Sequence, residues 1–156
     1  MTATDSKAIV QRFFEELWNE RRLATADEIF SPACVTHQLR SGSEDVGAPR
    51  NADAIKLHVH EWLMGFSDLR FEVEDTVAEA QRVVTRCVAQ GTHNGTWFGI
   101  PATGKRVRIR MMVTHRIEDG KIAEDWVLVD SLGFFQQLNI LPATEEILAA
   151  AILKQT

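Results

Sequence analysis

The sequence predicts an α+β fold, in which helices come first along the chain and pack on a curved, mainly antiparallel β-sheet. Three observations support this prediction. Apolar residues before Leu69 recur at helical spacing, whereas from Leu69 onward they alternate with polar residues as in strands. The dipeptide Asp119-Gly120 joins two alternating runs and is a strong hairpin signal. Strands joined by hairpins form antiparallel sheets, and a strongly twisted sheet wrapped over helices makes a cone that can enclose an apolar ligand.

Length and composition predict a single domain over residues 1–156. The chain is 45% hydrophobic and 25% charged, and its net charge is −5. This acidic balance gives no general reason to expect nucleic acid or an anionic membrane as a partner. The apolar runs are too short to span a membrane, and the polar N-terminus is unlike a secretory signal. Cys34 and Cys87 form no CxxC pair, which favours reduced, buried thiols in a cytoplasmic protein.

Apolar spacing and capping residues predict where each element begins and ends. Helices are expected over Lys7–Asn19, Ala26–Phe30, Ala52–Met64, Ser131–Leu138 and, as an extra C-terminal helix, Thr144–Leu153. Thr25-x-x-Glu28 matches a capping box, and Asn51 suits the cap of the third helix. Extended segments are expected over Cys34–Leu39, Leu69–Glu74, Val83–Thr92 and the hairpin Val107–Asp130. Residues 40–50, rich in turn formers and charge, predict a surface loop.

The hairpin Val107–Asp130 is the best candidate for chemistry, because titratable groups recur in it among large apolar side chains. His115 shares a face with Val107, Ile109, Met111, Val113 and Ile117, and the second strand carries Ile122, Glu124, Trp126, Leu128 and Asp130 on one face. If Asp119-Gly120 is a two-residue turn, His115 faces Glu124, and His115, Glu124, Trp126 and Asp130 line one surface. If Gly120 is a bulge in a three-residue turn, Thr114 faces Glu124 instead. The sequence leaves both registers open.

Several blocks of the sequence resemble the SnoaL-like ester cyclase (polyketide cyclase) family of the NTF2-like superfamily. They are GTHNGTWFGIPATGKRV, RIEDGKIAEDW and DSLGFFQQL, and the resemblance covers roughly residues 7 to 139. It implies a cone-shaped α+β fold and a homodimer with sheets packed face to face. It also implies ring closure of a polyketide ester by intramolecular aldol condensation, with acid–base catalysis and no metal or organic cofactor. The family's catalytic aspartate corresponds to Asp130, and a histidine on the preceding strand corresponds to His115. Two departures are Ser67, where the family usually has proline, and the helix beyond residue 139.

Each candidate residue has an ordinary structural alternative. Asp130 is the predicted general acid/base, or the N-cap of the following helix. His115 is the predicted assisting group for a developing oxyanion, or a hydrogen-bonded core residue. Glu124 orients His115 or pairs with Arg116. Glu124 is also one of the predicted substrate-binding residues. The others are Trp126 as a wall, His37 beside the loop, Trp18 and Phe14 from the first helix, and the lining residues Met111, Val113 and Leu128.

The scattered histidines predict no metal site, because His58 and His60 point in different directions on one helix. His93, in the loop Gly91–Lys105, is either a lid residue or the source of a loop-stabilising hydrogen bond.

The leading functional prediction is therefore a small enzyme without cofactor that acts on an apolar, carbonyl-bearing molecule. The alternatives are a non-catalytic binder or sensor of a small hydrophobic ligand, and another activity of this fold such as isomerase or hydratase. The expected partners are the small hydrophobic molecule and a second copy of the chain through the sheet face, with neither nucleic acid nor a membrane.

Overall fold

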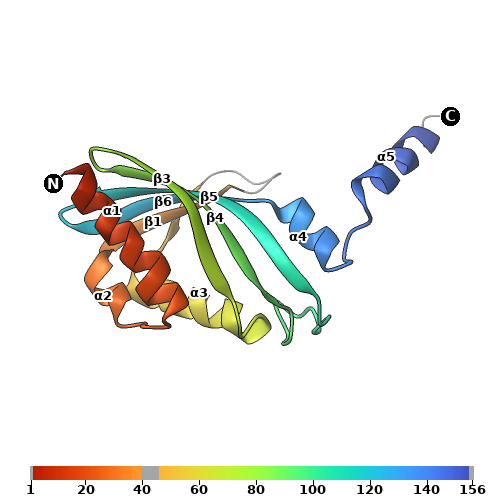
Figure 1. Cartoon of the computed structure of the whole chain (residues 1–156), viewed down its shortest axis with the longest axis horizontal. Helices are drawn as coiled ribbons and strands as arrows, with labels where there is room; N and C mark the ends of the chain where they lie inside the picture. Colours follow the sequence, from red (N-terminus) through yellow and green to blue (C-terminus); the bar gives the residue numbers. More distant parts are fainter. Residues whose placement is uncertain (1, 40–45, 155–156) are drawn as a thin grey trace.

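A six-stranded sheet curves around the N-terminal helices in the computed structural model, which describes residues 2–39 and 46–154. The strands lie in the order β2-β1-β6-β5-β4-β3 (Figure 1). Strands β1 and β6 pair in parallel, and the other pairs within the described ranges are antiparallel. The strand bounds are Phe30–Leu39 (β1), Ala48–Pro49 (β2), Arg70–Glu79 (β3), Arg82–Thr92 (β4), Arg106–Glu118 (β5) and Lys121–Val129 (β6). The predicted α+β class is confirmed.

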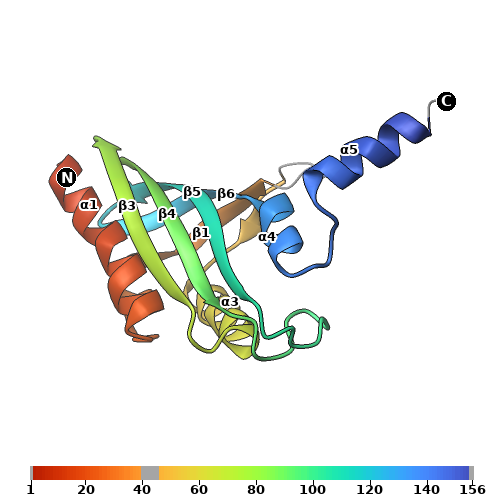
Figure 2. The same ribbon diagram turned by 45° about the vertical axis from the view of Figure 1, so that its right-hand side comes forward.

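Helices cover the concave side of the sheet, which is called the inner face below (Figures 1 and 2). The helical bounds are Ala3–Arg12 (α1), Phe13–Asn19 (η1), Thr25–Ile29 (α2), Ala52–Gly65 (α3), Ser131–Gln137 (α4) and Thr144–Leu153 (α5). The segments α1, η1, α2 and α3 pack over the inner face, while α4 follows β6 at one end of the sheet. Helix α5 extends away from the rest of the chain in both views.

The predicted first helix contains a change of winding. It begins as α1 and continues as the π-helix η1, in which Phe13, Phe14, Leu17 and Trp18 are all buried. π-helical turns are rare and are frequently found at functional sites. Here the wider winding presents two aromatic side chains, Phe14 and Trp18, to the inner face of the sheet.

The capping prediction for the second helix is wrong. Ala24 is the N-cap of α2 and makes no side-chain cap, while the Thr25 hydroxyl donates to Glu16 Oε2 at 2.9 Å. Glu28 accepts a hydrogen bond from Arg12 instead. Both members of the expected box are therefore engaged by the preceding helix, which lies close enough to compete with local capping.

The cap of α3 and the bounds of most later elements follow the predictions, whereas β3 extends to Glu79, five residues beyond the predicted end at Glu74. Asn51 Oδ1 accepts from Ala54 N at 3.0 Å and caps α3, as expected. Of the predicted loop 40–50, residues 40–45 lie outside the described residues, and Ala48–Pro49 pairs with β1 as the short strand β2. The core lies between the inner face and the helices, and Phe14, Leu17 and Ile109 are among its fully buried members.

Candidate functional site

The hairpin between β5 and β6 adopts neither of the two registers considered from the sequence. Glu118 pairs with Lys121, so Asp119-Gly120 is a two-residue turn, and both turn residues have positive φ as this turn requires. A bulge then follows, since Ile117 pairs with Ile122 whereas Arg116 pairs with Glu124. The extra residue in β6 is Ala123, and beyond it His115 faces Asp125 while Thr114 faces Trp126.

This bulge separates the predicted site residues onto two faces of the sheet. Side chains alternate between faces, so a slip of one residue moves a whole set to the other side. Met111, Val113 and His115 lie on the inner face, where Asp125 is their neighbour on β6. The predicted residues on the opposite, outer face are Glu124, Trp126 and Leu128. The expectation that His115, Glu124, Trp126 and Asp130 line one surface is therefore wrong.

His115 is sealed into the aromatic core. Its side chain is fully buried, with ring centroids 4.9 Å from Phe13 and 6.2 Å from Phe14. Neither ring nitrogen has a hydrogen-bond partner among the described residues. Burial lowers the pKa of His115 from 6.5 to about 3, because the charged imidazolium loses its hydration there. The imidazole is consequently neutral at physiological pH, with one nitrogen able to donate and the other able to accept.

Other polar atoms on the inner side share this lack of partners. The Trp18 indole nitrogen from η1 and the Thr85 hydroxyl from β4 are both buried, and neither is hydrogen-bonded to any residue that the structure describes. The Trp18 ring also lies edge-on to His58 of α3, with centroids 6.1 Å apart. Buried polar groups are nearly always satisfied in folded proteins, so each of these atoms marks a place that suits a polar ligand atom or water.

Asp125 is an inner-face carboxylate that the sequence-based candidates did not include. Its side chain is 5% exposed, and Oδ1 accepts from the Thr36 hydroxyl at 2.5 Å. Gln38 Nε2 donates in turn to Thr36 Oγ1 at 2.9 Å, which completes a short chain of hydrogen bonds on β1. Burial raises the pKa of Asp125, although the Thr36 hydrogen bond opposes the rise. The bulge hid this residue, because simple alternation from Glu124 assigns it to the wrong face.

Asp130 caps helix α4. Its Oδ1 accepts from Gly133 N at 2.9 Å, and its own backbone N–H donates to Arg110 O at 3.0 Å. The carboxylate lies so close to Gly133 that an added Cβ there would be 2.4 Å from Oδ2, which explains the Asp-x-x-Gly spacing of the DSLG block. Asp130 is exposed and follows Leu128 on the outer side of the sheet. The structure therefore gives it the capping role and does not bring it to His115.

His37 belongs to an outer-face cluster with Trp126 and Glu124. The His37 and Trp126 rings stack at 5.1 Å with 7° between their planes, and His37 Nε2 lies 2.9 Å from Glu124 Oε1. Arg116 Nε donates to Glu124 Oε2 at 2.9 Å, so the alternative that pairs Glu124 with Arg116 is the correct one. The hydrogen bond from Arg116, followed by that from His37, lowers the pKa of Glu124. Residues of this cluster cannot contact a molecule bound beside His115.

Phe14 and Trp18, in contrast, lie on the same side as His115. Both are almost fully buried on η1, and their rings pack against Phe71 of β3 at 5.6 Å and 4.9 Å. Met111 is partly buried against the same core, and Val113 is 3% exposed. Four of the predicted substrate-binding residues thus lie on the same side of the sheet as His115.

His93 holds the loop between β4 and β5. Its Nδ1 lies 3.1 Å from Thr103 Oγ1, and its ring stacks on Phe66 with centroids 4.9 Å apart. The loop-stabilising alternative for His93 is therefore observed. The Thr92 backbone and hydroxyl both donate to Asp68, which fastens the start of the same loop to the turn after α3.

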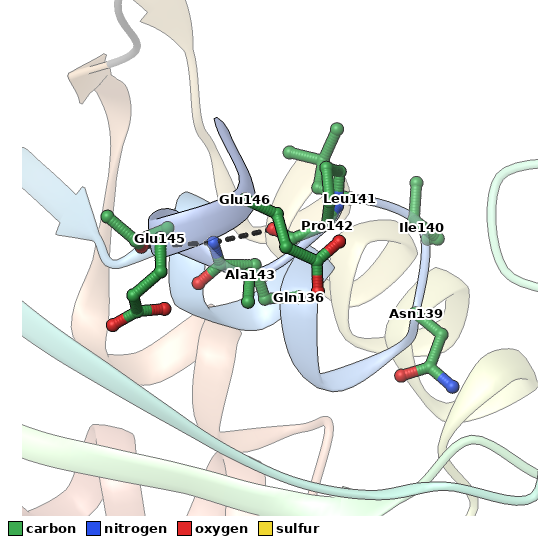
Figure 3. Close-up of a pocket in the computed structure, with 9 residues that line it drawn as sticks. Gln136, Asn139, Ile140, Leu141, Pro142, Ala143, Glu145 and Glu146 are labelled. Atoms are coloured by element: carbon green, nitrogen blue, oxygen red, sulfur yellow. Dashed lines mark hydrogen bonds between the residues drawn. The ribbon is translucent and has the colours of Figure 1, made fainter. Parts of the chain in front are cut away.

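Two open hollows lie on the surface, and neither contains His115. One is a groove of about 420 Å³ across β4, β5 and β6 on the outer face, bordered by Arg86, Arg110, Met112, Leu128 and Asp130. The other, of about 750 Å³, lies at the elbow between α4 and α5 (Figure 3). Within residues 2–39 and 46–154, no group of three His, Cys, Asp or Glu side chains is placed to hold a metal ion. No described helix is long and apolar enough to cross a membrane.

Known proteins place the fold and the family. AclR from Streptomyces galilaeus, named as a candidate hydroxylase, superposes with a TM-score of 0.79 at 28% identity over 99% of this chain and 93% of its own. IdmH from Streptomyces antibioticus, named as a candidate polyketide cyclase, superposes with a TM-score of 0.74 at 28% identity, and the match covers 86% of this chain and 98% of IdmH. TsrD from Streptomyces laurentii superposes with a TM-score of 0.75 at 25% identity, and the match covers 90% of this chain and 99% of TsrD. No relative matches among curated proteins. The family described as SnoaL-like polyketide cyclase matches residues 8–138, and the chain belongs to that family.

Proposed function

We propose that this protein is a cyclase-type enzyme without cofactor that closes a ring in an apolar, carbonyl-bearing small molecule held against the inner face of the sheet. The observation that carries the proposal is that Trp18, Thr85 and His115, from elements that pack on the inner side, all have buried polar atoms without a described partner. Such a site offers apolar walls for most of a flat ligand and a few hydrogen-bonding atoms for its oxygens. Membership of the polyketide cyclase family supports the same class of ligand.

The proposed reaction is an intramolecular aldol addition. A base removes a proton from a carbon next to one carbonyl, and the resulting enolate carbon bonds to a second carbonyl carbon of the same molecule. The electron pair of the second C=O π bond moves to its oxygen, which then takes up a proton. A C–H bond and a C=O π bond are thus replaced by a C–C bond and an O–H bond. No electrons are gained or lost overall. The site must therefore supply a proton acceptor and a hydrogen-bond donor for the developing oxyanion.

Inner-face residues offer both functions. Neutral His115 can donate one ring N–H to an oxyanion, which requires no change in its own charge. Asp125 lies directly across from it on β6, and its raised pKa makes it a stronger proton acceptor than an exposed aspartate. We assign the acid/base role on this face to Asp125. Asp130 is the carboxylate that corresponds to the family's catalytic aspartate, and it is the competing assignment.

Parallel Asp125→Asn and Asp130→Asn variants are expected to separate these two carboxylates. We expect Asp125→Asn to lower kcat by about a hundredfold or more, since general acid–base catalysis contributes that much, while Asn can still accept the Thr36 hydrogen bond. Asp130→Asn retains a capping oxygen and should change kcat less than about threefold. The substrate is first identified by thermal shift with carbonyl-bearing aromatic esters. Mass spectrometry then follows turnover, because the ring-closed product has the mass of the substrate or one water less.

If Asp130→Asn lost activity and Asp125→Asn kept it, the acid/base group would be the carboxylate at the end of β6. That result would overturn the assignment of this role to the inner face. Loss of activity in both variants with unchanged unfolding temperatures would mean that the two carboxylates act together, which the present arrangement of side chains does not allow. Circular dichroism of each variant provides the control for folding.

Non-catalytic binding of a small hydrophobic ligand is the second candidate function. It is favoured by one specific observation, the use of Asp130 as the N-cap of α4, which leaves the predicted catalytic carboxylate in a structural role. A binder should show ligand-dependent stabilisation without any product, and Asp125→Asn should then change affinity without a change in mass of the ligand. Thermal shift and mass spectrometry on the same samples distinguish the two functions.

A further inference from the structure

Two polar side chains of β1 form a chain of hydrogen bonds that ends on Asp125. β1 runs parallel to β6 with Thr36 beside Asp125 and Gln38 beside Val127, and residues two apart in a strand share a face. Thr36 is 3% exposed, whereas Gln38 is only partly buried. Because Thr36 and Asp125 lie 89 positions apart in the sequence, only the pairing of β1 with β6 brings them together.

The direction of each hydrogen bond in this chain is fixed by the groups that form it. An ionised carboxylate can only accept, so the Thr36 hydroxyl donates its single proton to Asp125 Oδ1 at 2.5 Å. The Thr36 oxygen is then left as an acceptor, and Gln38 Nε2 donates to it at 2.9 Å. Successive hydrogen bonds polarise one another, so the amide of Gln38 strengthens the bond from Thr36 to the carboxylate.

The chain engages only one oxygen of the Asp125 carboxylate. Among the residues that the structure describes, none donates a hydrogen bond to Oδ2, and none places a cationic group within ion-pair distance of it. Oδ2 keeps a little exposed surface, since it is not among the fully buried atoms that lack a partner. Buried polar atoms are nearly always hydrogen-bonded, so a carboxylate buried only for stability would have partners on both oxygens. An open oxygen beside a fixed one is suited instead to take up a proton.

The groups around Asp125 leave the Thr36 hydroxyl as the strongest influence that keeps it ionised. His115, directly across on β5, is neutral at physiological pH. Burial raises the pKa of the Cys34 thiol on β1 to about 12, so this group is neutral as well. Three charged side chains act on Asp125 through space, each less strongly than the Thr36 hydroxyl, and they are Arg50 and His37, which favour the ionised form, and Glu124, which opposes it.

We infer that Thr36 and Gln38 are positioning residues for Asp125, which hold its carboxylate through Oδ1 and leave Oδ2 to accept the proton from the substrate. This inference deepens the proposed function, because it rests on the acid/base role assigned above to Asp125. In the reaction, the proton leaves the carbon next to the carbonyl for Oδ2, and its electron pair stays on that carbon as the enolate. Oδ2 then returns the proton to the new alkoxide. Thr36 donates to Oδ1 throughout, so the carboxylate need not rotate between the two transfers.

The first test follows the titration of Asp125 itself and needs no substrate. In protein isotopically labelled at the aspartate side-chain carboxyl carbon, the NMR signal of Asp125 is identified by its absence from Asp125→Asn. Thr36→Val removes the hydroxyl from a side chain of the same shape. The titration midpoint of Asp125 should then move to higher pH, because a hydrogen bond to the charged form is lost. Thr36→Ser keeps a hydroxyl and should restore the native midpoint.

Gln38→Leu tests the other link of the chain, and Thr114→Val is the matched control. Gln38→Leu leaves Thr36 in place but removes its donor, so the midpoint should move in the same direction by a smaller amount. Thr114 lies opposite Trp126 on the outer face, and Thr114→Val should leave the midpoint unchanged. Circular dichroism establishes that each variant is folded. If Thr36→Val does not fold, Gln38→Leu decides alone, since that side chain is partly exposed. A native midpoint in the folded variants of this chain would overturn the inference.

Turnover separates positioning from a purely structural role. With the carbonyl-bearing aromatic ester found by thermal shift, we expect Thr36→Val to lower kcat roughly tenfold or more and to move the acid limb of the pH profile of kcat to higher pH. Thr36→Ser should remain close to the native enzyme. A shifted titration of Asp125 with a native pH profile of kcat would overturn the positioning role. Full turnover by Asp125→Asn would overturn the acid/base assignment itself, whereas an unchanged titration overturns only the inference.

Discussion

Replacing His115 by phenylalanine is expected to remove a large part of the chain's sensitivity to acid. His115 has a pKa of about 3 in the folded chain and about 6.5 when unfolded, so between these values the unfolded chain binds more protons. The free energy of unfolding therefore falls by up to about 1.4 kcal/mol for each pH unit below 6.5. The His115→Phe variant has no imidazole to protonate on unfolding, so it lacks this fall in the free energy of unfolding. Urea denaturation from pH 7 to 4.5 should show its stability relative to the native chain rising by about 2–3 kcal/mol.

Neighbouring groups and a control make this result specific. The raised pKa of Asp125 acts in the opposite direction, because its folded form binds protons more readily than its unfolded form, but it is present in both chains and cancels in the difference. His60→Gln, on the exposed side of α3, controls for the loss of one histidine. If the native chain and the His115→Phe variant lose stability in parallel, the imidazole is not held neutral in the core.

At neutral pH the same variant separates packing from function. Phenylalanine replaces two buried nitrogens that have no described partner with apolar atoms of similar shape, so the folded chain should lose little stability and can gain some. Turnover of an identified substrate should nevertheless fall if His115 hydrogen-bonds the developing oxyanion, by about a hundredfold for a single such donor.

The fold was predictable because most of its determinants are local. Asn51 caps α3 from within its own first turn, and the positive φ angles of Asp119 and Gly120 follow from residues that tolerate them. Apolar periodicity likewise located α4 and α5 to within one residue. The predicted capping box at Thr25 does not form because Thr25 and Glu28 make hydrogen bonds to residues of the preceding helix instead. Long-range contacts override local signals wherever they satisfy the same donors and acceptors.

The candidate site was less predictable because one inserted residue controls it. Ala123 carries no feature that marks a bulge, yet its extra place in β6 exchanges Glu124 for Asp125 opposite His115. The outer-face stack of His37 on Trp126 was hidden for the same reason, as it also needs the parallel pairing of β1 with β6. Sequence reasoning found the hairpin, but it could not show which carboxylate lies opposite His115 on the same face of the sheet.

Substituting Gly95 with alanine is expected to detach the loop Gly91–Lys105 from the end of α3. The N–H groups of Asn94 and Gly95 both donate to Gly65 O at 3.0 Å, and a Cβ on Gly95 would lie 1.9 Å from the Met64 carbonyl oxygen. The added Cβ would clash with backbone atoms, which cannot rotate away as a flexible side chain could. We therefore expect the free energy of unfolding to fall by about 3 kcal/mol or more. Gly99→Ala, which has positive φ but no neighbour within 4 Å, should cost only about 1 kcal/mol. Equal losses in the two variants would show that backbone strain, rather than close approach to α3, explains the glycine in this motif.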